Sequence, residues 1–118
     1  MSNTFFGISV DCTDADALAH FWGAVLGRQV ADGATAENAV LLANDEPGSG
    51  PRLAFHRVPE AKVVKNRLHL DLVSDRLFAE TERLVNLGAQ KLRDVEHGDA
   101  RWTTFADIEG NEFDVVAE

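Results

Sequence analysis

The sequence predicts an α+β fold built from two tandem copies of one strand–helix–strand–strand–strand module. Two helical patterns, at residues 14–26 and 75–87, have equal lengths, begin at an aspartate, end before a glycine and lie 61 positions apart. A strand pattern precedes each helix, and the apolar residues of these two strands match at an offset of 62. A period of about sixty residues that occurs only twice is too long and too rare for a solenoid, so it indicates two fused copies of one module.

The stretch at residues 67–73 opens the second copy and alternates polar and apolar side chains, as a half-buried strand does. Leu68 and the two other leucines of this stretch are expected to face the core. His69 and Asp71 then lie on the opposite face, so one short strand offers an imidazole and a carboxylate to the same surface. The counterpart of His69 in the first copy is Gly7.

Cap and turn signals place the remaining elements. Asp14 supplies an N-cap for the first helix, and Gly27 ends that helix. Residues 59–66 connect the two copies. Strands are expected at residues 5–12, 28–31, 38–44 and 52–58 in the first copy and at 67–73, 91–95 and 101–107 in the second, with a last strand ending at residue 117. The expected core stripes are Leu18, Phe21, Trp22 and Val25 on the first helix and Leu77, Phe78, Leu84 and Val85 on the second.

Composition limits the classes of function. A chain of 118 residues with 45% hydrophobic content is long enough to form one domain with a real core. It has no apolar run near the roughly eighteen residues that a membrane helix needs, and no secretory signal pattern, so we expect a cytoplasmic protein without membrane contact. The formal net charge of −9 argues against a nucleic-acid partner, because that binding depends on Lys and Arg neutralising phosphates.

Several common catalytic motifs are missing from the sequence. No glycine-rich phosphate loop follows a strand, no nucleophile elbow surrounds a serine, and a single cysteine excludes paired-cysteine zinc spacing. That cysteine, Cys12, ends the first strand, where a buried structural thiol is expected.

Local motifs make the chain similar to a known superfamily. The first helix of the vicinal oxygen chelate superfamily resembles residues 19–22 (Ala-His-Phe-Trp) together with the Leu-Gly pair at 26–27. The Asp-Pro-Glu-Gly-Asn-Glu-Phe loop of that superfamily resembles residues 107–113 (Asp-Ile-Glu-Gly-Asn-Glu-Phe), in which Ile108 replaces the usual proline. Residues 58–72 resemble its glyoxalase-like branch. This superfamily includes glyoxalase I, extradiol dioxygenases, and fosfomycin and bleomycin resistance proteins.

The resemblance implies how the two copies work together. It implies a single glyoxalase-like domain over residues 1–118, with modules at about 4–58 and about 66–118 that form a curved mixed sheet around a concave ligand cavity. Because half-barrel modules leave sheet edges that relatives cover by pairing two chains, a homodimer is also expected.

The resemblance also implies candidate metal ligands, two from each module. The second module supplies His69 on its first strand and Asp114 on its last, although Asp is shorter than the glutamate usual there. The first module supplies Gly7, which has no ligating atom, and His56 as the nearest candidate on its last strand. His56, His69 and Asp114 together would hold Fe, Mn, Ni or Zn in an open site.

Strand alternation extends the candidate ligand-binding face. Phe113 and Val115 are expected in the core, which turns Asp114 towards the concave side with His69. Trp102 and Phe105 lie on opposite faces of their strand, so one of them can wall the cavity for a planar or apolar ligand. The predicted ligand-binding residues are His56, His69, Asp71, Trp102 and Asp114; no residue is assigned a catalytic role.

Two functions follow from this set. The first is a protein that binds a small organic molecule without a metal and without chemistry, in the manner of bleomycin-resistance relatives; the gap at Gly7 favours it. The second is a metal-dependent lyase, isomerase or dioxygenase acting on the vicinal oxygens of a small substrate.

Overall fold

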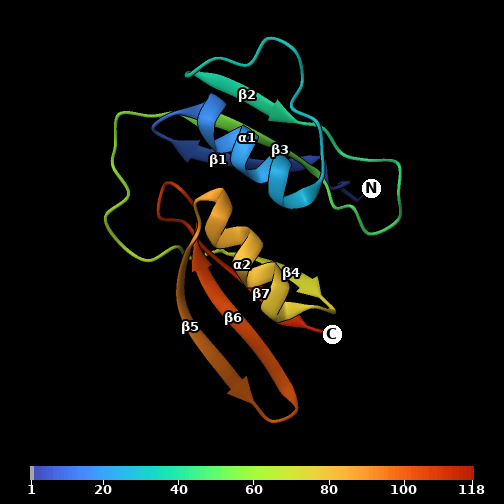
Figure 1. The fold of residues 1–118 in the computed structure, drawn as a ribbon. Helices are drawn as coiled ribbons and strands as arrows, with labels where there is room; N and C mark the ends of the chain where they lie inside the picture. Colours follow the sequence, from blue (N-terminus) through green and yellow to red (C-terminus); the bar gives the residue numbers. More distant parts are fainter. Residues whose placement is uncertain (1) are drawn as a thin grey trace. The chain divides into compact units, whose positions relative to one another are not determined.

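The computed structural model describes residues 2–118 and divides them into two compact units, of which the first ends at Ala61 and the second begins at Lys62. Each unit combines one helix with one open mixed sheet (Figure 1). The α+β two-module fold predicted from the repeat is therefore confirmed. Neither helix in the described part of the chain is long and apolar enough to cross a membrane.

The first unit carries a three-stranded sheet with one helix packed on it. The order of the strands is β1-β3-β2, with β1 parallel and β2 antiparallel to β3, and α1 packs on β2 and β3. The elements are β1 (Gly7–Cys12), α1 (Ala15–Leu26), β2 (Asn38–Leu41) and β3 (Arg52–Arg57).

Helix α1 forms where its capping residues predict. The Asp14 carboxylate accepts a hydrogen bond from the backbone N–H of Ala17 at 3.1 Å, and Gly27 ends the helix in the left-handed region at φ 64°. The predicted apolar stripe is buried, and the rings of Phe21 and Trp22 meet edge to face with their centroids 5.6 Å apart. Each such buried side chain contributes roughly 1.5 to 3 kcal/mol to folding.

The strand predicted at residues 28–31 is reduced to a single bridge between Val30 and Leu41. The backbone N–H of Leu42 still bonds to the carbonyl of Gln29 at 3.1 Å, but the carbonyl of Leu42 accepts from the Arg28 side chain at 2.6 Å. The Arg28 side chain thus occupies the Leu42 carbonyl that the next backbone hydrogen bond of the strand pair would need, and the strand pairing stops there.

The second unit contains the complete module. Its strand order is β4-β7-β6-β5, with β4 parallel to β7 and the remaining neighbours antiparallel, and α2 packs on β5 and β7. The elements are β4 (Leu70–Ser74), α2 (Leu77–Leu87), β5 (Gln90–His97), β6 (Ala100–Ala106) and β7 (Glu112–Ala117).

The core stripe predicted for α2 is wrong for two of its four residues. Leu84 is fully buried and Leu77 half-buried, whereas Phe78 is 82% exposed and Val85 is 46% exposed. Positions seven apart on a helix share a side, but Phe78 lies about 120° around the helix from Leu84. The helix also begins at Leu77 rather than at residue 75.

The prediction that Leu68 faces the core is also wrong. Strand β4 begins only at Leu70, and Leu68, which precedes it, is 89% exposed. The helix-side face of the sheet is instead filled by β6 and β7, where the rings of Phe105 and Phe113 stack with their centroids 5.4 Å apart. His69 therefore belongs to the approach to the strand, not to its ladder.

The two units repeat the same hydrogen-bonding register. In the first, the N–H of Val58 continues the parallel ladder to the carbonyl of Cys12; in the second, the N–H of Glu118 does so to the carbonyl of Ser74, both at 2.9 Å. The first strands therefore correspond at an offset of 62, as predicted, and the last strands at an offset of 60.

Candidate functional site

One face of the sheet in the second unit gathers several of the predicted site residues. Asp71 on β4 lies opposite Asp114 on β7, and Asp114 lies opposite Thr104 on β6. Residues directly opposite each other on paired strands point to the same side of a sheet. The two carboxylates and the hydroxyl therefore form one polar row across three strands.

His69 completes this row from the segment just before β4. Its Nδ1 lies 3.1 Å from Oδ1 of Asp71 and 3.5 Å from Oδ2 of Asp114. The structure thus brings His69 beside Asp71 and Asp114, the two carboxylates that were predicted to share its face.

Asp114 is the more enclosed of the two carboxylates, with a side chain 15% exposed, whereas the side chain of Asp71 is 60% exposed. The hydroxyl of buried Thr104 donates to Oδ1 of Asp114 at 2.6 Å and fixes its orientation. Thr104 was not predicted, although its alternation with Trp102 on the same strand was a usable signal.

The contacts of His69 with Asp71 and Asp114 indicate which ring nitrogen carries the proton when His69 is neutral. Ionised carboxylates only accept hydrogen bonds, so the Nδ1 that faces both of them carries the proton. The lone pair is left on Nε2, away from these contacts. In this form, His69 can accept a hydrogen bond from a ligand.

The same three side chains form a donor set that a divalent metal accepts. One ligand atom from each of His69, Asp71 and Asp114 lies within 4.8 Å of the other two. Imidazole nitrogen and carboxylate oxygen suit Mn, Fe, Ni and Zn. A metal bound through Nδ1 would have to replace the proton there, so the two arrangements exclude each other.

An apolar row runs beside the polar one on the same face. The pairing places Val73 on β4, Val116 on β7, Trp102 on β6 and Val95 on β5 in one line across the sheet. Trp102 and Val116 are half-buried, and Val73 is 65% exposed. Two residues along a strand span about 7 Å, so a small molecule can contact both rows at once.

His56 lies on β3 of the first unit. It is exposed, and its Nδ1 lies 2.8 Å from Oδ1 of Asn38 on the neighbouring strand. In the register that relates the two units, the counterpart of Asp114 is Ala54, whereas His56 corresponds to Val116, two residues further along the same face. The participation of His56 in a metal or ligand site remains a prediction.

Gly7, the counterpart of His69, offers no donor atom and no space for one. It pairs with Arg52 on β3, and a Cβ at Gly7 would lie 2.8 Å from Cγ and 3.0 Å from the carbonyl oxygen of Arg52. The Arg52 guanidinium lies over the ring of Phe6, 4.7 Å from its centroid. The arginine stem thus occupies the position that a ligating side chain would need.

Comparison with known proteins agrees with this architecture. The sequence profile of the glyoxalase-like domain matches residues 7–116. No curated protein sequence gives a significant match.

Similar solved structures cover almost the whole chain at low sequence identity. The fosfomycin resistance protein FosX from Mesorhizobium loti is 13% identical with a TM-score of 0.73, covering 100% of this chain and 94% of its own. A mutant of FosX from Listeria monocytogenes, in complex with Mn(II) and 1S,2S-dihydroxypropylphosphonic acid, is 14% identical with a TM-score of 0.77, covering 99% and 91%. A glyoxalase-related enzyme from Fulvimarina pelagi is 20% identical with a TM-score of 0.74, covering 99% and 89%.

Structural similarity at this level of sequence identity shows a shared fold. The profile match shows sequence similarity along nearly the full length of the chain. Both agree with the doubled module, in which the first strand pairs in parallel with the last. The chain therefore belongs to the glyoxalase-like domain family of the vicinal oxygen chelate superfamily.

Proposed function

We propose that this protein binds a small organic molecule through His56, His69, Asp71, Trp102 and Asp114, and that this binding needs no metal. The polar row and the apolar row on one face of the second sheet support the proposal most directly. Two carboxylates and an imidazole can bind the polar groups of a ligand, while Trp102 and the neighbouring valines accept a planar or apolar body.

The first unit supports the metal-free version of this function. Gly7 contributes no ligand atom, and Arg52 fills the space beside it. In this proposal the two modules, about 4–58 and about 66–118, belong to a single domain, and the protein acts as a homodimer. Light scattering at micromolar concentration tests the dimer, because a mass near 12.9 kDa would contradict it.

A fragment screen by two-dimensional NMR tests the ligand. The library should contain planar and apolar compounds with and without vicinal oxygens, and saturable shifts are expected at the Trp102 indole N–H and the Asp71 amide. Trp102→Leu should weaken binding about fivefold or more, since a well-packed aromatic contact contributes about 1 kcal/mol beyond its buried area. Phe78→Leu is the matched control, because Phe78 is an exposed aromatic on α2. Hits that bind Trp102→Leu as well as the wild type would contradict the proposal.

The second candidate function is a metal-dependent lyase, isomerase or dioxygenase, and the convergence of His69, Asp71 and Asp114 favours it. A divalent metal held there would act as a Lewis acid towards the vicinal oxygens of a substrate. The protein's own contribution would be to orient that substrate against Trp102 and to hold Asp114 through Thr104.

Metal analysis separates the two candidates. The purified protein is incubated with Mn, Fe, Ni or Zn, desalted and assayed for bound metal. About one equivalent in the wild type, lost in His69→Ala but kept in His20→Ala, supports the metal-dependent function; His20 is the matched control because it lies on α1 beside Asp16. A wild type without bound metal supports metal-free binding. His56→Ala then shows whether the first unit contributes a ligand.

A further inference from the structure

The segment that carries His69 has little packing to hold it. Residues 62–69 form neither helix nor strand, and Leu68, next to His69, is 89% exposed. Yet Nδ1 of His69 lies within 3.5 Å of Asp114, a residue from the other end of the module. A contact of this length is lost if the segment moves by about 1 Å.

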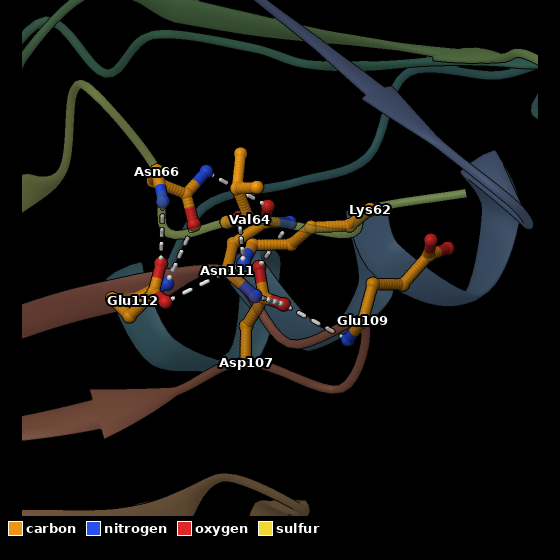
Figure 2. A network of polar contacts seen from close by, with 7 residues as sticks. All are labelled: Lys62, Val64, Asn66, Asp107, Glu109, Asn111 and Glu112. Carbon is orange, nitrogen blue, oxygen red and sulfur yellow. Dashed lines mark hydrogen bonds and ion pairs between the residues drawn. The ribbon is translucent and has the colours of Figure 1, made fainter. Parts of the chain in front are cut away.

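Two reciprocal hydrogen bonds tie this segment to the start of β7 (Figure 2). The backbone N–H of Asn66 donates to Oε2 of Glu112 at 3.1 Å, and the backbone N–H of Glu112 donates to Oδ1 of Asn66 at 3.1 Å. Lys62 adds an ion pair to Oε1 of Glu112 at 3.4 Å and donates to the carbonyl of Val64 at 2.7 Å. We call the Asn66–Glu112 pair the clasp.

The clasp rests on a loop whose shape is fixed by its own hydrogen bonds. Buried Asp107 accepts from the backbone N–H groups of Glu109 and Asn111 at 2.9 and 3.0 Å. The amide nitrogen of Asn66 donates to Oδ1 of Asn111 at 3.1 Å, so the segment is held by the loop as well as by the strand (Figure 2). An Asx-type turn of this kind holds its backbone without help from neighbouring elements.

The position of the clasp links the two ends of the candidate site. Asn66 precedes His69 by three residues, and Glu112 precedes Asp114 by two on the same face of β7. Burial raises the pKa of the Glu112 carboxyl, but the hydrogen bonds from the Asn66 and Glu112 backbone N–H groups and from Lys62 lower that pKa more. The clasp therefore contains a carboxylate bonded on both of its oxygens.

We propose that Asn66 and Glu112 are positioning residues, and that their reciprocal hydrogen bonds hold His69 against Asp114. This inference rests on the proposed function in one respect, namely that His69 and Asp114 belong to the binding site. The clasp does not touch a ligand; it fixes the distance between two groups that do.

The test measures the contact itself by NMR, without a ligand. The ¹⁵N shift of His69 Nδ1 is recorded at about pH 9, where an imidazole is neutral. Asp114→Asn is expected to move this shift in the wild-type background. Glu112→Ala and Asn66→Ala should abolish that response, because the segment is no longer held near β7. Glu112→Gln keeps an acceptor oxygen for the Asn66 N–H and should retain the response.

Glu82→Ala, on an exposed position of α2, is the matched control and should also retain the response. If Glu112→Ala fails to fold, Asn66→Ala, which leaves the charge on Glu112, gives the answer. A response to Asp114→Asn that survives in both clasp variants would overturn the proposal, as would a loss of thermal stability with the response unchanged. Failure to find a small-molecule ligand would contradict the proposed function but would leave this measurement unaffected.

Discussion

Asp71 and Asp114 lie directly opposite each other on adjacent parallel strands, and both carboxylates point to the same side of the sheet. Like charges in this arrangement repel each other, and the net charge of −9 adds to the repulsion. We expect Asp71→Asn to raise the free energy of unfolding by about 0.2 to 1 kcal/mol at low ionic strength and by less in salt. Urea unfolding at two salt concentrations measures both values.

A matched variant separates this local effect from the general loss of one negative charge. Glu82→Gln removes a charge from an exposed position of α2 and should raise stability by less than Asp71→Asn does. If neutralising Asp71 stabilises the fold, its charge does not serve stability, and ligand binding is a function that such a charge can serve. Destabilisation by more than about 1 kcal/mol would instead make Asp71 a structural residue.

The second prediction concerns Gly7. A methyl group added there would lie 2.8 Å from Cγ and 3.0 Å from the carbonyl oxygen of Arg52, so Gly7→Ala should cost about 1 to 3 kcal/mol of folding free energy. Combining it with Arg52→Ala should recover part of this cost, because the side-chain clash disappears while the backbone clash remains. Thermal unfolding of the four proteins in this double-mutant cycle measures the coupling.

Ser9→Ala, two residues along the same strand and exposed, is the control and should be close to neutral. Strictly additive effects of Gly7→Ala and Arg52→Ala would contradict the clash. If the coupling is found, a histidine at position 7 needs Arg52→Ala beside it, which removes the closer, side-chain clash and leaves only the 3.0 Å approach to the backbone carbonyl.

The third prediction concerns Arg28, which is buried and whose hydrogen-bond partners among residues 2–118 are backbone carbonyls. Burial lowers the pKa of its guanidinium, yet the group stays charged in proteins and so needs its acceptors. The four acceptors are the carbonyl oxygens of Leu42 at 2.6 Å, Pro51 at 2.8 Å, Leu41 at 3.2 Å and Ser49 at 3.2 Å. Two of these carbonyls lie at the end of β2 or directly after it, and two lie within three residues of the start of β3, so Arg28 holds both ends of the long connection between these strands.

Arg28→Met should therefore lower the free energy of unfolding by about 3 kcal/mol, since one buried and three partly buried carbonyls lose their donor together. Arg57→Met is the control, because the Arg57 guanidinium forms an exposed pair with Glu37 at 3.5 Å, and such pairs contribute about 0 to 1 kcal/mol. Chemical denaturation compares the two variants. Equal losses would show that the carbonyl contacts of Arg28 contribute little.

Local signals in the sequence predicted most of the fold. The limits of α1 follow from a capping aspartate and a left-handed glycine, which act within a few residues of the helix end. The repeat could be recognised because both modules begin with a strand and a helix of the same pattern. The strand at residues 28–31 could not be excluded, because what ends its pairing is the reach of Arg28 to a carbonyl 14 residues away.

The candidate site was predictable only in part, for a similar reason. Strand alternation placed Asp71 and Asp114 on one face, but their direct opposition depends on the parallel register of β4 and β7, which no local pattern encodes. Phe78 was wrongly placed in the core because its exposure depends on which side of α2 packs against the sheet, and this is set by tertiary packing. The clasp joins Asn66 to Glu112 across 46 positions, so a single sequence gives no signal for it.

The last prediction uses the pKa of Glu112 to make the clasp visible in the pH dependence of stability. Burial raises this pKa, but the hydrogen bonds from the two backbone N–H groups and Lys62 lower it by more. The folded pKa therefore lies below the unfolded value of about 4.3. A carboxylate with a lowered folded pKa stabilises the protein above its unfolded pKa, and this contribution is lost as the pH falls through the folded pKa.

Glu112→Gln should therefore be less stable than the wild type at pH 7, by about 1 to 2 kcal/mol for the lost charged hydrogen bonds, and the gap should close when both are measured near pH 2 to 3. Urea unfolding across this range gives the difference directly, with Glu82→Gln as the reference for the loss of one negative charge. A gap that is the same at both ends of the range would mean that Glu112 stabilises the fold through shape rather than charge. A gap that widens on acidification would show that its folded pKa is raised and would contradict the lowering by Asn66 and Lys62.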